Sequence, residues 1–236
     1  MNPVDSKYIP THTKAIIFDL DGTLYDQNRL RRRMFLELLL QVFRDRRFIR
    51  EIYTLYCFRK NRELLSENGD DDGCLEHRQY AEVADELGLN IGDVRAVVQE
   101  WICDKPLGHI GACIYPGAKE LFDLLTKRGI KIAVFSDYPC RDKLDALDLP
   151  VDEMVCSTET EVDRFKPNPK GLLLAAEKLS TPIQNCLFIG DREDRDGECA
   201  KRVGMPYFIL SQRSTPATDW YRKAARQLKE EVGFFS

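Results

Sequence analysis

The sequence lacks a hydrophobic run long enough to cross a membrane. A spanning helix needs about 20 apolar residues, and the best stretch, residues 35–43, is interrupted by Glu37 and Gln41. Residues 1–14 are polar and contain no apolar segment of the kind found in a secretory signal. The sequence therefore predicts a cytoplasmic protein that makes no membrane contact.

The eight cysteines show neither a disulfide pattern nor a zinc pattern. None of them forms a CxxC pair, and no group of cysteines and histidines has the spacing of zinc ligands. Several cysteines lie inside apolar runs, which is typical of reduced, buried thiols. We therefore expect neither disulfide bonds nor a zinc site.

Two nucleotide-binding motifs are also missing. The absence of GxxxxGKS/T excludes a P-loop nucleoside triphosphatase, and the absence of GxGxxG removes the usual fingerprint of dinucleotide binding. The charge is nearly balanced, with 35 Lys and Arg residues against 39 Asp and Glu residues, a net charge of −4. This balance argues against a nucleic-acid partner, because nonspecific binding to nucleic acid needs a basic face.

What the 236-residue sequence does contain is an alternation of strand-like apolar runs and helical patterns. Strands are predicted at 14–20, 130–136 and 185–190, with weaker ones at 153–156 and 206–210. Helices are predicted at 118–128, 141–147, 170–179 and 197–203. Such alternation favours parallel βαβ units, so the predicted fold class is α/β, a Rossmann-like parallel sheet flanked by helices.

Residues 27–113 break this alternation because they contain no convincing strand. Apolar residues recur at helical spacing in 29–48, 49–65, 76–87 and 91–103, and the polar stretch 66–73 indicates a loop. We therefore expect an all-helical domain of residues 27–113 inserted into a core of residues 1–26 and 114–236. A terminal helix is predicted at 219–231.

Two carboxylates follow the first predicted strand. Asp19 and Asp21 lie two residues apart on an extended segment, so both side chains can face one site, and Gly22 permits a tight turn after them. Carboxylates this close repel each other unless a cation or a shared proton offsets their charge. The pattern predicts a magnesium site with one carboxylate available for nucleophilic attack, with a solvated acidic turn as the alternative.

Three further segments place polar groups at or near strand ends. The Ser136 hydroxyl and the backbone N–H groups that follow it, starting at Asp137, can hold an anionic oxygen. Lys166 precedes Pro167, which stiffens the loop and holds the ammonium in place, and Asp191 follows the strand at 185–190. Because open parallel sheets bind ligands outside the carboxyl ends of their strands, these groups predict a site for magnesium and phosphate.

Together, these motifs resemble those of the haloacid dehalogenase superfamily, in the phosphoglycolate-phosphatase-like branch with a helical cap inserted after the first motif. Four motifs match in order, DLDGTL, VFSD, RFKPNP and FIGDREDRD, and they extend from Asp19 to Asp196. The resemblance implies a Rossmann-like core and a cap that closes over the site and excludes bulk water.

The resemblance also implies a role for each matched residue. Asp19 would be the nucleophile that forms an aspartyl-phosphate, and its carboxylate would bind Mg²⁺. Asp21 would act as general acid and base, and its backbone carbonyl would bind the metal. Ser136 and Lys166 would complete the catalytic set and, with Asp137, would bind the phosphoryl oxygens of the substrate.

The fourth motif adds further acids. By the same resemblance, Asp191 would be a metal ligand. Asp194 and Asp196 compete for the second acidic position. Asp196 fits the GDxxxxD spacing and is predicted to contact the metal ligands without binding the metal itself.

The function implied by the resemblance is a magnesium-dependent phosphatase that hydrolyses a small phosphorylated metabolite. The intact DxDGT motif favours phosphate chemistry over dehalogenation, because a dehalogenase needs neither magnesium nor an acid that protonates an alcohol. A phosphomutase acting on a sugar phosphate and a non-catalytic binding or regulatory protein stay open as alternatives. The sequence leaves the substrate open among phosphoglycolate, sugar phosphates and nucleoside monophosphates, and it leaves the oligomeric state open.

A basic run opens the first predicted helix of the insert. It consists of Arg29, Arg31, Arg32 and Arg33. Such a run indicates either a solvated helix face or a surface that attracts an anionic substrate.

Overall fold

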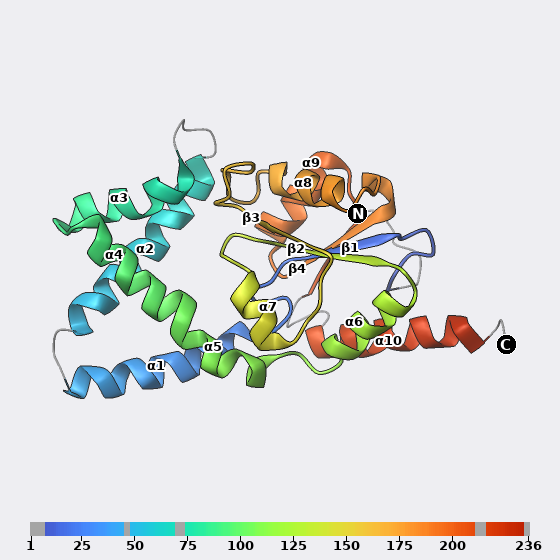
Figure 1. Ribbon diagram of the computed structural model, residues 1–236, viewed down its shortest axis with the longest axis horizontal. Helices are drawn as coiled ribbons and strands as arrows, with labels where there is room; N and C mark the ends of the chain where they lie inside the picture. Colours follow the sequence, from blue (N-terminus) through green and yellow to red (C-terminus); the bar gives the residue numbers. More distant parts are fainter. Residues whose placement is uncertain (1–7, 45–47, 69–73, 211–215, 234–236) are drawn as a thin grey trace.

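The computed structural model describes residues 8–44, 48–68, 74–210 and 216–233. Its centre is a parallel sheet of five strands in the order β3-β2-β1-β4-β5 (Figure 1). The strands are β1 (Ala15–Phe18), β2 (Lys131–Ser136), β3 (Glu153–Cys156), β4 (Cys186–Gly190) and β5 (Tyr207–Ile209). The predicted α/β class and parallel sheet are confirmed, and β1 lies in the middle between β2 and β4.

Helices cover both faces of the sheet, above and below it in Figure 1. On one face, α6 (Ala118–Lys127), α7 (Arg141–Leu147) and α10 (Ala217–Gly233) pack against strand residues such as Ile16 and Phe18. On the other face, α8 (Lys170–Lys178) and α9 (Glu198–Val203) pack against Ile17 and Phe135. Because successive strand side chains point to opposite faces, a fully apolar strand supplies both cores. Each large apolar side chain buried in this way contributes about 1.5–3 kcal/mol.

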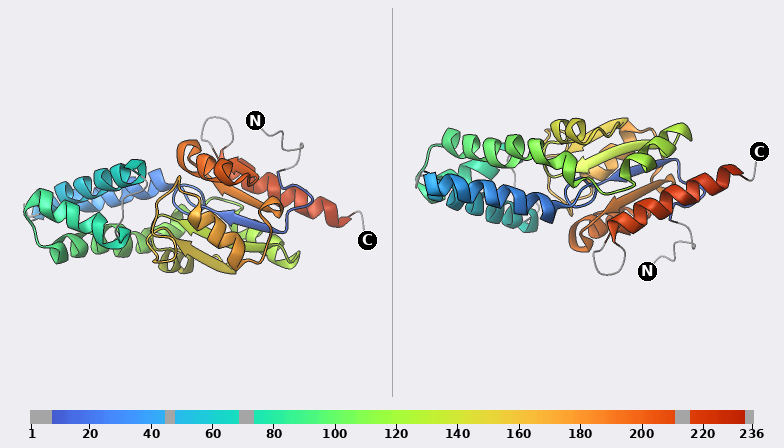
Figure 2. Two further views of the ribbon diagram at one scale, coloured as in Figure 1. Left: turned by 90° about the horizontal axis from the view of Figure 1, so that it is seen from above. Right: turned by 90° about the horizontal axis from the view of Figure 1, so that it is seen from below.

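The described residues between 27 and 113 form a series of helices with short connections between them. They are α1 (Gln27–Arg44), α2 (Phe48–Asn68), α3 (Leu75–Leu87), α4 (Ile91–Val98), a π-helical turn η1 (Gln99–Asp104), α5 (Lys105–Ile110) and a 3₁₀ turn η2 (Gly111–Cys113). This helical insert has its own apolar core, which includes Phe58, Val83, Val94 and Trp101. Figure 2 shows it projecting from one end of the sheet, away from the C-terminal end of α10.

The insert leaves and rejoins the core at one place. Tyr25 and Ile114 form an antiparallel bridge, and the N–H of Asp26 donates to the carbonyl of Cys113 at 2.9 Å. The segment that leads from β1 into the insert and the segment that leads back to the core therefore run side by side. We propose, as the sequence predicts, that residues 27–113 act as a domain separate from the core.

Two predicted boundaries in the insert differ from the structure. The loop predicted at 66–73 begins later, because α2 runs to Asn68; residues 69–73 lie outside the described part of the chain. The helix predicted to end at residue 103 continues through η1, α5 and η2 to Cys113. Pro106 lies in the first turn of α5, directly after η1.

Two predictions about what the chain lacks can be compared with the structure. All eight cysteines carry free thiols, and six of them are buried. Across the ranges that the structure describes, no helix combines the length and the hydropathy that a membrane span requires.

Candidate active site

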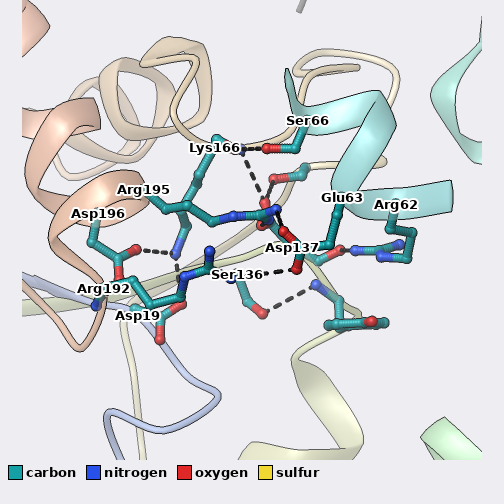
Figure 3. Close-up of polar contacts among 12 residues, drawn as sticks. Asp19, Arg62, Glu63, Ser66, Ser136, Asp137, Lys166, Arg192, Arg195 and Asp196 are labelled. Carbon is teal, nitrogen blue, oxygen red and sulfur yellow. Dashed lines mark hydrogen bonds and ion pairs between the residues drawn. The ribbon is translucent and has the colours of Figure 1, made fainter. Parts of the chain in front are cut away.

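Four separate segments meet at the carboxyl ends of the central strands. Asp19 follows β1, Ser136 ends β2, and Lys166 lies in the connection between β3 and α8 (Figure 3). Asp191 follows β4. Neighbouring strands are about 4.8 Å apart, so residues at these ends are brought together by the sheet itself. All seven predicted site residues line one cavity of about 900 Å³, the other three being Asp21, Asp137 and Asp196.

Lys166 is the cation at the centre of this cluster. Its Nζ atom lies 2.5 Å from Asp19 Oδ1 and 2.9 Å from Asp196 Oδ1, and the residue is only 2% exposed. Burial disfavours the ammonium ion, but the charges of Asp19 and Asp196 outweigh burial and raise the pKa of Lys166 well above its ordinary value. Lys166 is therefore a fixed positive charge beside Asp19.

Asp19 is held at both carboxylate oxygens. Oδ1 accepts from Lys166, and Oδ2 accepts from the Thr23 hydroxyl at 2.9 Å. Burial raises the pKa of Asp19, Lys166 opposes this rise, and the charges of Asp196 and Asp191 add to it. The carboxylate is thus fixed in direction and faces the cavity.

Three carboxylates converge at this point with one ammonium between them. Asp19, Asp191 and Asp196 each offer an oxygen, and these oxygens lie within 4.8 Å of one another. Burial, followed by the charge of Asp196, raises the pKa of Asp191 to about 7. A divalent cation would offset this repulsion, and carboxylate oxygens are the ligands that Mg²⁺ prefers. The donor set therefore fits magnesium.

Gly22 is required at this position for two reasons. Its φ is +97°, a left-handed value that favours glycine. A Cβ atom there would also collide with the carboxylate of Asp191. The glycine of the DLDGT motif therefore lets the first and fourth motifs approach each other.

Asp196, rather than Asp194, faces the site. Asp196 is buried, and its Oδ2 accepts the N–H groups of Asp191 at 3.2 Å and Arg192 at 3.1 Å. Asp194 is exposed and pairs with the Arg192 side chain at 2.7 Å. This geometry supports the assignment of Asp196 as the second acid of the fourth motif.

Asp21 has two partners that the motif does not include. Its Oδ1 accepts from Lys143 Nζ at 2.6 Å and from the Tyr25 hydroxyl. Burial raises the pKa of Asp21, but the charge and hydrogen bond of Lys143, together with the Tyr25 hydroxyl and the charge of Lys166, outweigh burial and lower it. Within the described chain, the Oδ2 atom is buried without a hydrogen-bond partner. The Asp21 side chain is not part of the acid cluster around Asp191, so its metal contact through the backbone carbonyl stays a prediction.

The Asp137 carboxylate contacts residues on other loops of the site. Oδ1 accepts from the Ser157 hydroxyl at 2.5 Å and from the N–H of Lys166 at 3.2 Å, while Oδ2 lies 3.5 Å from Arg195 Nη1. A carboxylate repels phosphate, so the predicted phosphate contact would come from backbone N–H groups here. Ser136 is buried, and its Oγ accepts the N–H of Tyr138, which leaves the hydroxyl proton available to an anion.

One turn of α2 reaches these loops from the helical insert (Figure 3). Arg62 Nη2 donates to the carbonyl of Asp137 at 2.6 Å, and Ser66 Oγ donates to the carbonyl of Lys166 at 2.5 Å. Glu63 pairs with Arg195 and, at 3.4 Å, with Arg192. The insert therefore contacts the loops of the second, third and fourth motifs.

Sequence reasoning missed Lys143 and the residues on α2. Lys143 shares a face of α7 with the buried Leu147, four residues later, and a lysine on an apolar face is a signal for a buried partner. For Arg62 and Ser66 no such local signal exists, because their partners lie 75 and 100 residues away.

Known proteins of similar sequence and fold indicate the family of this chain. A family model described as haloacid dehalogenase-like hydrolase matches residues 13–204. Protein CbbY of Rhodobacter capsulatus is 28% identical over 221 residues, covering 88% of this chain and 89% of that protein. A phosphoglycolate phosphatase of Pseudomonas syringae pv. syringae (strain B728a) is 26% identical over 217 residues, covering 84% of this chain and 69% of that protein.

A solved structure shares the fold. The 2-haloacid dehalogenase from Pseudomonas syringae pv. Tomato DC3000 matches with a TM-score of 0.58 and 17% identity, over 95% of this chain and 100% of that one. At this identity the likeness concerns the fold alone. Because the family model spans most of the sequence, including all four motifs, the chain belongs to the haloacid dehalogenase-like hydrolases.

Proposed function

We propose that the protein is a magnesium-dependent phosphatase that hydrolyses a small phosphorylated metabolite through an aspartyl-phosphate intermediate. The observation that carries this proposal is the 2.5 Å contact between Asp19 and Lys166 beside the acids Asp191 and Asp196, all at the wall of one cavity. The phosphoglycolate phosphatases among the relatives support the reaction class.

In the first half of the reaction, a carboxylate oxygen of Asp19 attacks phosphorus. The new bond joins Asp19 to the phosphoryl group, and the P–O bond to the leaving group breaks with its electron pair on the leaving oxygen. Asp21, once it carries a proton, gives it to that oxygen, so an alcohol departs. The Lys143 charge lowers the pKa of Asp21 and opposes this protonation, so the role requires that the contact with Lys143 change when substrate binds. Lys166 and Ser136 hold the phosphoryl oxygens throughout.

In the second half, water attacks phosphorus and the bond to Asp19 breaks. Asp21, now ionised, takes a proton from the attacking water, which returns both carboxyl groups to their starting state. Magnesium, when held by Asp19, Asp191 and the backbone carbonyl of Asp21, would supply positive charge to the phosphoryl oxygens.

The Asp19→Asn variant tests this proposal most simply. An amide oxygen is a poor nucleophile, so we expect release of phosphate from p-nitrophenyl phosphate in the presence of MgCl₂ to fall by at least about 10³-fold. Asp194→Asn is the matched control, because Asp194 is exposed and is not among the residues that line the cavity. Substantial activity in Asp19→Asn would contradict the assignment of Asp19 as the nucleophile.

The same assay separates the phosphatase from the two alternatives. Isomerisation of a sugar phosphate without release of inorganic phosphate would identify a phosphomutase. Stable binding of phosphate esters without turnover would identify a binding protein. The proposal requires inorganic phosphate as the product.

A further inference from the structure

The cavity above Asp19 extends well beyond the space that a phosphoryl group needs. Its volume of about 900 Å³ lies in the range of pockets that hold whole small-molecule ligands. One wall carries the predicted catalytic residues of the core, and another is formed by α1, α2 and η1 of the insert. The alcohol part of a substrate bound at Asp19 therefore meets side chains of the insert.

Four apolar residues of the cavity, which we call the distal wall, lie as two pairs on two helices. Phe35 and Leu39 belong to α1, and Ile52 and Tyr56 belong to α2. The members of each pair are four residues apart, a spacing that puts both side chains on one face of a helix. Each helix therefore turns a pair of apolar side chains toward the same cavity.

The hydrophobic cores of the protein do not use the distal wall. Within the described ranges, none of its four residues belongs to the core of the insert or to the two cores beside the sheet. Phe35 is 58% exposed and Tyr56 is 61% exposed. By contrast, Leu55 and Trp101 line the same cavity but are buried in the core of the insert. Exposed apolar surface that lines a cavity is typical of a ligand groove.

Charged and apolar side chains are separated along the two helices. α1 runs away from the core, and α2 returns toward it (Figure 1). On α1, Arg31 lies one turn nearer the core than Phe35, and on α2, Arg59 and Glu63 lie nearer the core than Tyr56. Among the described lining residues of these helices, no charged side chain lies farther from the core than the distal wall begins.

The distal wall also lies far from the phosphoryl site. Gln27, where α1 begins beside the core, lines the cavity, and so does Leu39, twelve residues later. At 1.5 Å per residue, these two positions are about 18 Å apart along the helix. A leaving group of two or three carbons held at Asp19 would therefore end before it reached the distal wall.

Resting on the proposed function, we propose that the substrate is a phosphate monoester of an alcohol with an extended apolar chain, and that this chain binds between α1 and α2 against the distal wall. The phosphoryl group has Ser136 and Lys166 on the core. The chain covers apolar surface that the fold leaves exposed to water, which is favourable. A molecule that is anionic at one end and apolar at the other matches the separation of side chains along the two helices.

A series of phosphonates tests the proposal without any turnover. With MgCl₂ present, calorimetry compares methylphosphonate, butylphosphonate and octylphosphonate, the last below its aggregation concentration. Burial of the chain predicts an affinity that rises about 4-fold for each CH₂ group placed against the wall, so octylphosphonate should bind at least about 50-fold more tightly than methylphosphonate. A phosphonate with an oligoether chain of the same length should lose most of this gain, because its oxygens bind water.

Substitutions assign the gain to the distal wall. Leu39→Asn and Ile52→Asn should each weaken binding of octylphosphonate about 10-fold or more and leave binding of methylphosphonate as in the wild type. Leu40→Asn and Ile49→Asn are the matched controls, because both residues are exposed on the same helices and neither is among the residues that line the cavity. The controls should leave both affinities unchanged. Thermal unfolding confirms that each variant is folded.

No binding of octylphosphonate, or equal affinity for it and for methylphosphonate, would overturn the proposal. So would an oligoether chain that binds as tightly as the octyl chain, a gain that survives Leu39→Asn and Ile52→Asn, or the same loss in the two controls. Because phosphonates are not hydrolysed, these results are separate from the Asp19→Asn assay. Failure of this proposal is therefore distinguishable from failure of the proposed phosphatase activity.

Discussion

At the residue scale, the Lys166 ammonium offsets the negative charge of the carboxylates in the site. Its ammonium is buried and contacts both Asp19 and Asp196, so two carboxylates share one cation. Removing one partner of a buried ion pair leaves an uncompensated charge, which costs more than the pair itself contributes. The residue that we expect to bind phosphate is therefore also a structural residue.

The Lys166→Met variant follows from this balance. It keeps the length and apolar stem of the side chain but removes the charge, so we expect the free energy of unfolding of the metal-free protein to fall by roughly 3–5 kcal/mol at pH 7. Urea unfolding measures it. Lys201→Met is the control, because Lys201 pairs with Glu193 at the surface, and we expect little change there. Equal stability of both variants would contradict the buried charge balance.

A pH dependence follows from Asp191. Its pKa is raised to about 7, while the unfolded carboxyl titrates near pH 4. Between about pH 4 and 7 the folded, metal-free protein holds a proton that the unfolded chain has lost, so this group destabilises the fold as the pH rises through that window. Magnesium needs the ionised carboxylate, so its affinity should rise over the same range.

Calorimetric titration with MgCl₂ at successive pH values measures that rise. Asp194→Asn should show the same curve as the wild type, because Asp194 lies outside the cluster of acids. A magnesium affinity that is the same at pH 5 and pH 8 would argue against Asp191 as a ligand.

The residues that sequence reasoning could identify are those that end a strand. Asp19, Ser136 and Asp191 follow apolar runs, and the order of the motifs adds Lys166. The sequence does not predict the contact between Lys143 and Asp21, because 122 residues separate them and no local pattern encodes such a pair. Their catalytic roles stay predictions until variants are assayed.

At the element scale, α2 connects the insert to the core. Arg62 inserts its guanidinium between the rings of Tyr138, at 3.9 Å, and Phe165, at 4.2 Å, and donates to the carbonyl of Asp137. These groups belong to the loops of the second and third motifs. The position of α2 is therefore coupled to the loops that carry Ser136 and Lys166.

Arg62→Ala should weaken this connection. It removes two hydrogen bonds, to the Asp137 carbonyl and to Gln79, and three cation–π contacts. We therefore expect the free energy of unfolding to fall by about 1–3 kcal/mol. Lys60→Ala, an exposed position on the same helix, should change it by less than about 0.5 kcal/mol. Denaturant unfolding compares the two. An Arg62→Ala protein as stable as Lys60→Ala would mean that the contact contributes nothing to docking of the insert.

The sequence predicts helices and strands correctly where a segment has one clear hydrophobic pattern. Apolar runs located all five strands. The signal is clearest for β1, β2 and β4, because central parallel strands buried on both faces have no polar alternation. For residues 104–113 the sequence predicts no helix, because Pro106 and Gly108 weaken the helical pattern there. Packing of α5 against its neighbours in the insert and the core supplies what local propensity lacks.

At the scale of the whole molecule, the sheet and the insert form two sides of one cavity. The core brings acids and an ammonium to one edge of the sheet, and the insert adds arginines and apolar side chains opposite them. The order of motifs along the chain predicted the first side. The second side depends on how the helices of the insert pack against one another and against the core, which a single sequence does not encode locally.

The central claim is that Asp19 accepts the phosphoryl group. Rapid acid quenching of the enzyme during turnover of a phosphate ester with MgCl₂, followed by peptide mass spectrometry, tests it directly. The account predicts a phosphorylated peptide in which the modification maps to Asp19 and which is absent from Asp19→Asn. Phosphate release at an unchanged rate with the phosphoryl group on another residue, or on none, would contradict it.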